Sequence, residues 1–126
     1  MGNRMKASYN LRPGKTIAGA VDAVILCLRG DDMEIQTFFQ DNMHIIQARA
    51  SNAKLKFLIG RDKAIEVRLM PAGNDAVIAE VGGARWLDKV IWLYCPLRAI
   101  SAWSGLREQR QIINRVEKVI NAYFNS

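Results

Sequence analysis

The chain has few of the residues that build metal sites and disulfide frameworks. It contains two cysteines, Cys27 and Cys95, and one histidine, His44. The cysteines are far apart in the sequence, both lie in apolar surroundings, and no histidine stands at ligand spacing from them. Because a structural zinc site needs four cysteine or histidine ligands, we predict no metal site and no cofactor. Both cysteines are expected to pack as small apolar side chains.

Long apolar runs are also missing. The opening residues, MGNRMKASYN, lack the apolar core of a secretory signal. The run Val90–Leu97 is much shorter than the about 20 residues that span a bilayer, and Arg98 follows it. The sequence therefore predicts no transmembrane segment and a cytoplasmic location, with peripheral attachment to a membrane left open.

No catalytic signature is present. Ser101 and Ser104 lack the context of a nucleophile elbow, and Gly82-Gly83 lacks the spacing and the lysine of a phosphate loop. Glu66 and Glu80 fall on neighbouring predicted strands, where two carboxylates could approach as acid–base chemistry requires. Both alternate with apolar residues, so we expect them on a solvated sheet face and predict no enzymatic activity and no catalytic residues.

A helix is the first element that the sequence predicts. Apolar residues at helical spacing follow Pro13, which a first helical turn tolerates, and Gly30 is expected to end the helix. Residues 1–12 are expected to form a loose leader before a single domain over residues 13–126. Within this leader, Tyr9 and Leu11 either add a short edge strand or simply pack down.

From Met33 the apolar period changes from that of a helix to that of a strand. Strands are predicted at Met33–Phe39, Met43–Ala50, Ala64–Met70 and Ala76–Val81. The pair Gly82-Gly83 is expected to end the last strand, after which a helix runs to the C-terminus with a kink at Pro96. The prediction is an α+β fold: a four-stranded antiparallel meander with both helices on one face. The expected core is Ile17, Val21, Val24, Leu28, Ile65, Val67, Leu69, Ile113, Val116 and Ile120.

Three stretches resemble a set of small bacterial domains with a leading helix, four strands and a terminal helix. They are IIQARAS in one hairpin strand, AIEVRLMPAGNDAVIAEVGGARWLDK across the last two strands, and PLRAISAWSGLREQRQI at the entry to the last helix. The likeness covers roughly residues 10–124. It implies the fold, and it carries no assigned activity.

An apolar and basic patch is the strongest candidate site. In a meander, alternate loops lie at the same end of the sheet, so residues 51–63 and 82–103 are expected to meet. Apolar and aromatic side chains in these segments alternate with lysines and arginines. The candidate interaction residues are Lys54, Lys56, Phe57, Leu58, Arg61, Arg85, Trp86, Lys89, Trp92, Tyr94 and Arg98.

Several functions fit this patch and the formal net charge of +6. Large apolar patches mark contact surfaces, so we predict a self-association or protein-interaction module. The structural alternative is that the patch residues pack among themselves within the fold. Lysine and arginine around tryptophan also fit an anionic membrane surface, which is the first alternative. The second alternative is nucleic-acid binding by the last helix, with Arg107, Arg110, Arg115 and Lys118, although Glu108 and Glu117 dilute its charge.

Overall fold

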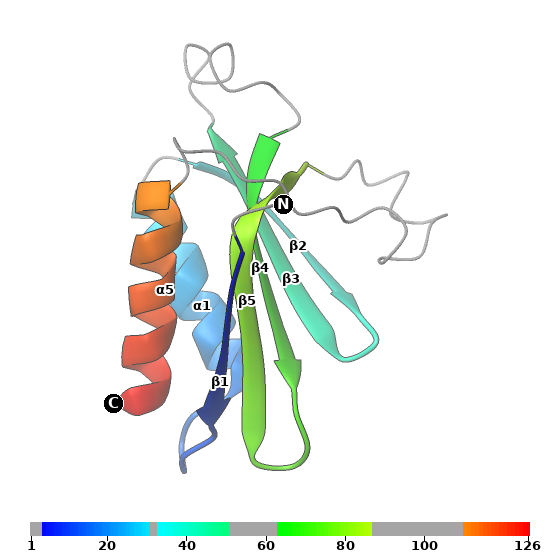
Figure 1. The fold of residues 1–126 in the computed structure, drawn as a ribbon, viewed down its shortest axis with the longest axis vertical. Helices are drawn as coiled ribbons and strands as arrows, with labels where there is room; N and C mark the ends of the chain where they lie inside the picture. The colour runs from blue at the N-terminus through cyan, green and yellow to red at the C-terminus, as the bar shows by residue number, and fades with distance from the viewer. Residues whose placement is uncertain (1–3, 31–32, 51–62, 87–109) are drawn as a thin grey trace.

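The computed structural model describes residues 4–30, 33–50, 63–86 and 110–126. These residues form an α+β fold with two helices and a five-stranded antiparallel sheet (Figure 1). The elements are β1 (Arg4–Asn10), α1 (Ile17–Gly30), β2 (Met33–Gln40), β3 (Met43–Ala50), β4 (Lys63–Pro71), β5 (Ala76–Arg85) and α5 (Arg110–Asn125). The expected kink at Pro96 lies outside the described residues.

The strand order is β1-β5-β4-β3-β2, so the predicted meander of four strands is confirmed and a fifth strand extends it. The expectation of a loose leader is wrong for residues 4–10, because they form β1 along the whole of β5, from Arg4 opposite Gly82 to Asn10 opposite Ala76. Burial explains the strand: Tyr9, at its end, packs against the core and stacks on Phe124 with ring centroids 5.2 Å apart.

Helix α1 begins at Ile17, later than the sequence suggested. Pro13 and Gly14 form a turn, with Gly14 at a φ of 84° that favours glycine. Thr16 then caps the helix, because its Oγ1 accepts a hydrogen bond from the backbone N–H of Gly19 at 2.9 Å. Pro13 therefore lies before the helix and not in its first turn, whereas the predicted end at Gly30 is confirmed.

The turns and the strand ends explain the register. Asp41 and Asn42 have φ values of 54° and 62°, the signature of a two-residue type I′ hairpin turn between β2 and β3. The expectation that Gly82-Gly83 ends the last strand is wrong, since β5 continues to Arg85. Pairing with β4 holds the glycines in the strand, Gly82 opposite Glu66 and Gly83 opposite Ile65.

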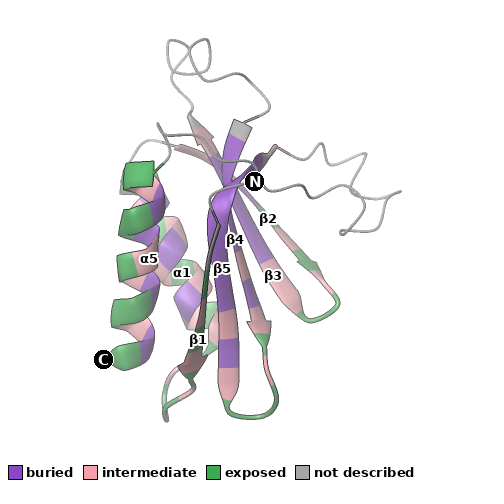
Figure 2. Ribbon diagram, in the orientation of Figure 1, coloured by how far each residue is buried: buried purple, intermediate pink, exposed green. Residues whose placement is uncertain are grey.

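The hydrophobic core lies between the sheet and the two helices, which cover one face of the sheet (Figure 1). Figure 2 shows the buried residues of both helices on the sides that face the strands. All ten residues of the expected core are confirmed, eight of them buried and Ile17 and Val21 partly buried against the rest. The sequence analysis missed Phe124, which is fully buried near the C-terminal end of α5.

Candidate functional site

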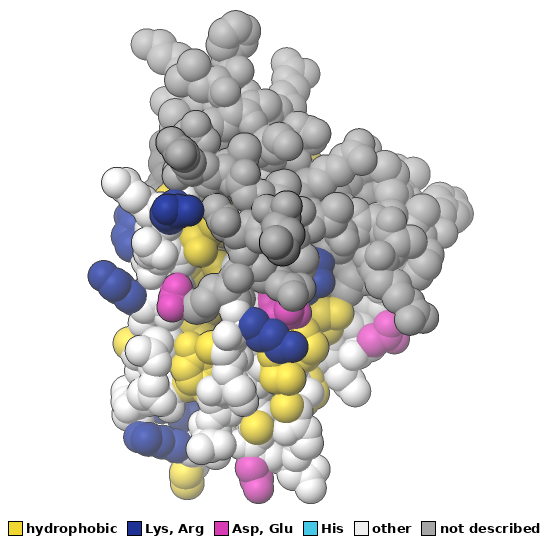
Figure 3. Space-filling view, viewed as in Figure 1, with side chains coloured by type: hydrophobic (Ala, Val, Ile, Leu, Met, Phe, Trp, Pro, Cys, Tyr) yellow, Lys and Arg dark blue, Asp and Glu magenta, His cyan; other side chains and the backbone are white. Residues whose placement is uncertain are grey.

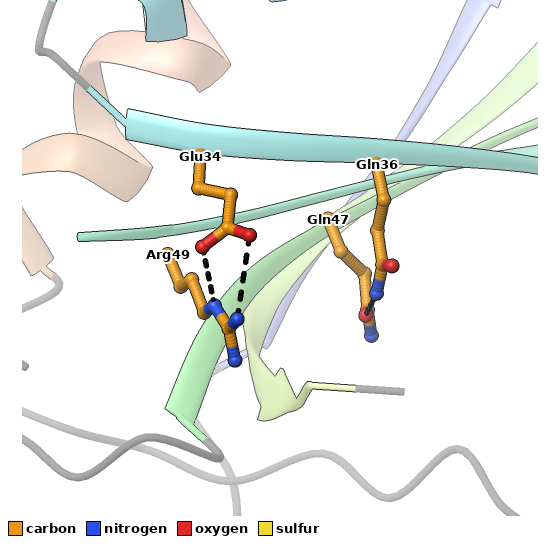
Figure 4. A network of polar contacts seen from close by, with 4 residues as sticks. All are labelled: Glu34, Gln36, Gln47 and Arg49. Atoms are coloured by element: carbon orange, nitrogen blue, oxygen red, sulfur yellow. Dashed lines mark hydrogen bonds and ion pairs between the residues drawn. The ribbon is translucent and has the colours of Figure 1, made fainter. Parts of the chain in front are cut away.

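Polar side chains form a buried row on the sheet face that the helices do not cover. Gln36, Gln47 and Glu66 lie side by side on β2, β3 and β4, in register with one another. The Nε2 of Gln36 donates to the Oε1 of Gln47 at 2.8 Å (Figure 4), and the Nε2 of Gln47 donates to the Oε1 of Glu66 at 2.7 Å. Each amide nitrogen thus donates to the next residue in the row, and the row ends at the Glu66 carboxylate, which can only accept. This direction fixes the orientation of both amides.

Arg68 completes this polar row. Its Nε donates to the second carboxylate oxygen of Glu66 at 2.6 Å, and Arg68 lies directly across from Glu80 on β5. Glu80 in turn faces Lys6 on the edge strand β1. Positive and negative side chains therefore alternate across three strands, an arrangement that stabilises each charge.

The expected solvated positions of Glu66 and Glu80 are wrong. Glu66 has no exposed surface and Glu80 is 8% exposed. The two carboxylates do lie near each other, as diagonal neighbours on β4 and β5, but Arg68 is directly across from Glu80 and bonds to Glu66. Because a buried charge must be paired and hydrogen-bonded, this arrangement suits a structural network better than proton transfer to a substrate.

A second cluster joins three strands at one end of the same face. The guanidinium of Arg49 makes two hydrogen bonds to the carboxylate of Glu34, at 2.8 and 3.3 Å (Figure 4). The same guanidinium lies 4.1 Å from the ring centroid of Trp86. Trp86 follows β5, and Arg49 is on β3, so this cation–π contact spans β4. It anchors a partly exposed tryptophan on the sheet end.

Most of the predicted interaction patch lies outside the described residues, namely Lys54, Lys56, Phe57, Leu58, Arg61, Lys89, Trp92, Tyr94 and Arg98. The meander on which the patch was predicted is present in the described residues. Lys63 at the start of β4 pairs with Arg85 at the end of β5, and β3 ends at Ala50 (Figure 1). The end of β3, the start of β4 and the end of β5 therefore lie at the same end of the sheet.

Sequence reasoning missed four residues of these clusters: Glu34, Gln36, Gln47 and Arg49. A signal existed, because β3 and β4 each carry two polar residues two positions apart, Gln47 with Arg49 and Glu66 with Arg68. That spacing places the two residues of each strand on one face, and the register brings Gln47 opposite Glu66. The same alternation is typical of a solvated face, and the sequence alone does not show that this second face is buried.

Charge is mixed on the face of the molecule that Figure 3 shows. Lysine and arginine side chains are scattered over the described part of this face, with acidic side chains among them. In the described ranges, no cluster of three or more histidine, cysteine, aspartate or glutamate side chains could hold a metal ion. No helix in those ranges has the length and apolar character needed to cross a bilayer.

Comparisons with protein-family models, curated proteins and solved structures found no match to this chain.

Proposed function

We propose that this protein is a non-enzymatic interaction module that associates with itself through the sheet end around Trp86. The observation that carries the proposal is the anchoring of Trp86 over Arg49, beside the paired ends of β4 and β5. Tryptophan and arginine are the residues most enriched in the energetic centres of protein interfaces. A tryptophan fixed by its neighbours loses little conformational entropy when a partner covers it.

Local charge pairing favours a protein partner over an anionic membrane. Arg49 is ion-paired with Glu34, and Arg68 with Glu66, so these two arginines contribute little net positive charge to the face that carries Trp86. Attraction to anionic lipid depends on uncompensated lysine and arginine near the surface. Peripheral membrane binding through the patch remains the alternative, since its sequence includes Lys54, Lys56, Arg61, Lys89 and Arg98.

Light scattering beside vesicle co-sedimentation separates these two functions. We expect the purified protein to form a concentration-dependent oligomer, and neither neutral nor anionic vesicles to sediment it. Trp86→Ala should weaken the oligomer, whereas Trp86→Phe should keep most of it, because an aromatic ring still lies over Arg49. Circular dichroism of both variants controls for loss of the fold.

The opposite pattern would reject the proposal. A monomer at every concentration that sediments with anionic vesicles at low salt, and is released by salt, would establish the membrane alternative.

A further inference from the structure

The two edges of the sheet differ in their protection against pairing with another strand. Natural edge strands are commonly blocked by lysine, other charges or proline. Edge strand β1 carries Arg4 and Lys6. Edge strand β2 (MEIQTFFQ) has no lysine, arginine, proline or glycine, and its one charge, Glu34, is already ion-paired with Arg49 within the chain. By the residues of the two strands themselves, β2 is therefore the unprotected edge.

The hairpin turn determines which backbone groups of β2 point away from β3. In a two-residue turn the carbonyl of the residue before the turn accepts from the N–H of the residue after it, so Gln40 and Met43 are a hydrogen-bonded pair. Hydrogen-bonded and non-hydrogen-bonded pairs alternate along an antiparallel ladder. Counting back along the β2–β3 register, the residues with outward N–H and C=O groups are Met33, Ile35, Thr37 and Phe39.

An exposed apolar side chain lies on the same strand. Within the described ranges, the large hydrophobic residues with high exposure are Leu26 at 74% and Phe39 at 61%. Phe39 lies on β2 itself, whereas Leu26 lies on α1. The edge without blocking residues therefore carries an exposed phenylalanine.

We propose that β2 pairs antiparallel with β2 of a second copy of this chain, about a two-fold axis at Gln36. In this register Met33 lies opposite the partner's Phe39, and Ile35 opposite the partner's Thr37, so all four outward-facing residues find hydrogen-bonding partners. Gln36 meets the partner's Gln36 on the helix-free face, where it extends the buried amide row. The two five-stranded sheets then form one continuous sheet.

This inference deepens the proposed self-association but uses a surface separate from Trp86, so substitutions distinguish the two. Thr37 is exposed, and Thr37→Lys adds a charge to the edge without removing a buried group. We expect it to raise the dimer dissociation constant, measured by size-exclusion chromatography with light scattering, by about tenfold or more. The matched control is Ser8→Lys at an exposed position of the other edge strand, β1, which should leave the constant unchanged.

Amide hydrogen exchange of the unmodified protein provides the second measurement. The amides of Met33, Ile35, Thr37 and Phe39 should exchange fast at low protein concentration and become protected as the concentration rises. A strictly monomeric protein, a dimer without protection at these amides, or equal effects of Thr37→Lys and Ser8→Lys would each overturn the proposal. Weakening by Trp86→Ala together with no effect of Thr37→Lys would reject the β2 pairing and keep the sheet-end proposal.

Discussion

Glu66 is the residue on which the buried polar row depends. It accepts hydrogen bonds from both Gln47 and Arg68 and has no exposed surface. Such a carboxylate costs free energy to desolvate, and the cost is offset only while its partners remain. Its place in the middle of the sheet makes it a sensitive probe of whether the row is structural.

We predict that Glu66→Ala lowers the free energy of unfolding by about 2–4 kcal/mol, because it removes the carboxylate that accepts hydrogen bonds from Gln47 and Arg68 at a buried site. Glu66→Gln keeps the shape and one amide acceptor and should cost clearly less. Urea denaturation of the three proteins measures the difference. Equal stabilities would show that the row does not stabilise the sheet.

Tyr9 gives the fold a specific response to alkaline pH. Burial raises the pKa of Tyr9 above its ordinary value of 10.0, and the negative charge of Glu117 raises it further. The unfolded chain therefore loses this proton at lower pH than the folded protein does. The contribution of Tyr9 to stability is complete below about pH 10 and is lost as pH rises through the folded pKa.

Tyr9→Phe should remove this part of the alkaline destabilisation while keeping the ring that stacks on Phe124. Thermal unfolding of both proteins between pH 8 and 11 tests it. Parallel pH profiles would contradict the assignment.

At the scale of elements, the start of α1 is tied to the end of α5. Thr16 caps α1 with its hydroxyl, and its backbone N–H donates to the Tyr123 hydroxyl at 3.1 Å. Tyr123 also lies close against Gly19, where an added Cβ would overlap its hydroxyl. The two helices therefore meet at a contact that depends on a cap, a glycine and a tyrosine.

Thr16→Ala should reduce the free energy of unfolding by about 0.5–2 kcal/mol through loss of the cap. Thr16→Ser retains the hydroxyl and should be close to the unmodified protein. Chemical denaturation that gave the same loss for both would show that the methyl group, and not the cap, is responsible.

Sequence periodicity predicted the elements that bury one side and failed where two sides are buried. The apolar stripe of α1 and the alternation of β4 correctly predicted the core residues Val24, Leu28 and Val67. These residues lie between the helices and the sheet, and an apolar periodicity is enough to identify that side of each element. Alternation alone could not show that Glu66 on the opposite side is buried as well. Gly82-Gly83 misled the prediction because strand pairing overrides the conformational freedom of glycine.

At the scale of the molecule, the described residues form one layer of helices on one face of a sheet, with a polar network on the other face and an unprotected edge at β2. The antiparallel meander brings the start of β4 and the end of β5 together, where Lys63 pairs with Arg85. Most patch residues lie outside the described ranges, so the contribution of Phe57, Trp92 and their neighbours to association stays a prediction.

Sedimentation equilibrium of the unmodified protein over a wide concentration range tests the central claim, self-association, most directly. We expect a reversible shift from the 14.2 kDa of one chain to twice that mass or a higher multiple as concentration rises, because two separate contact surfaces allow assemblies larger than a dimer. A single species of 14.2 kDa at every concentration would contradict it.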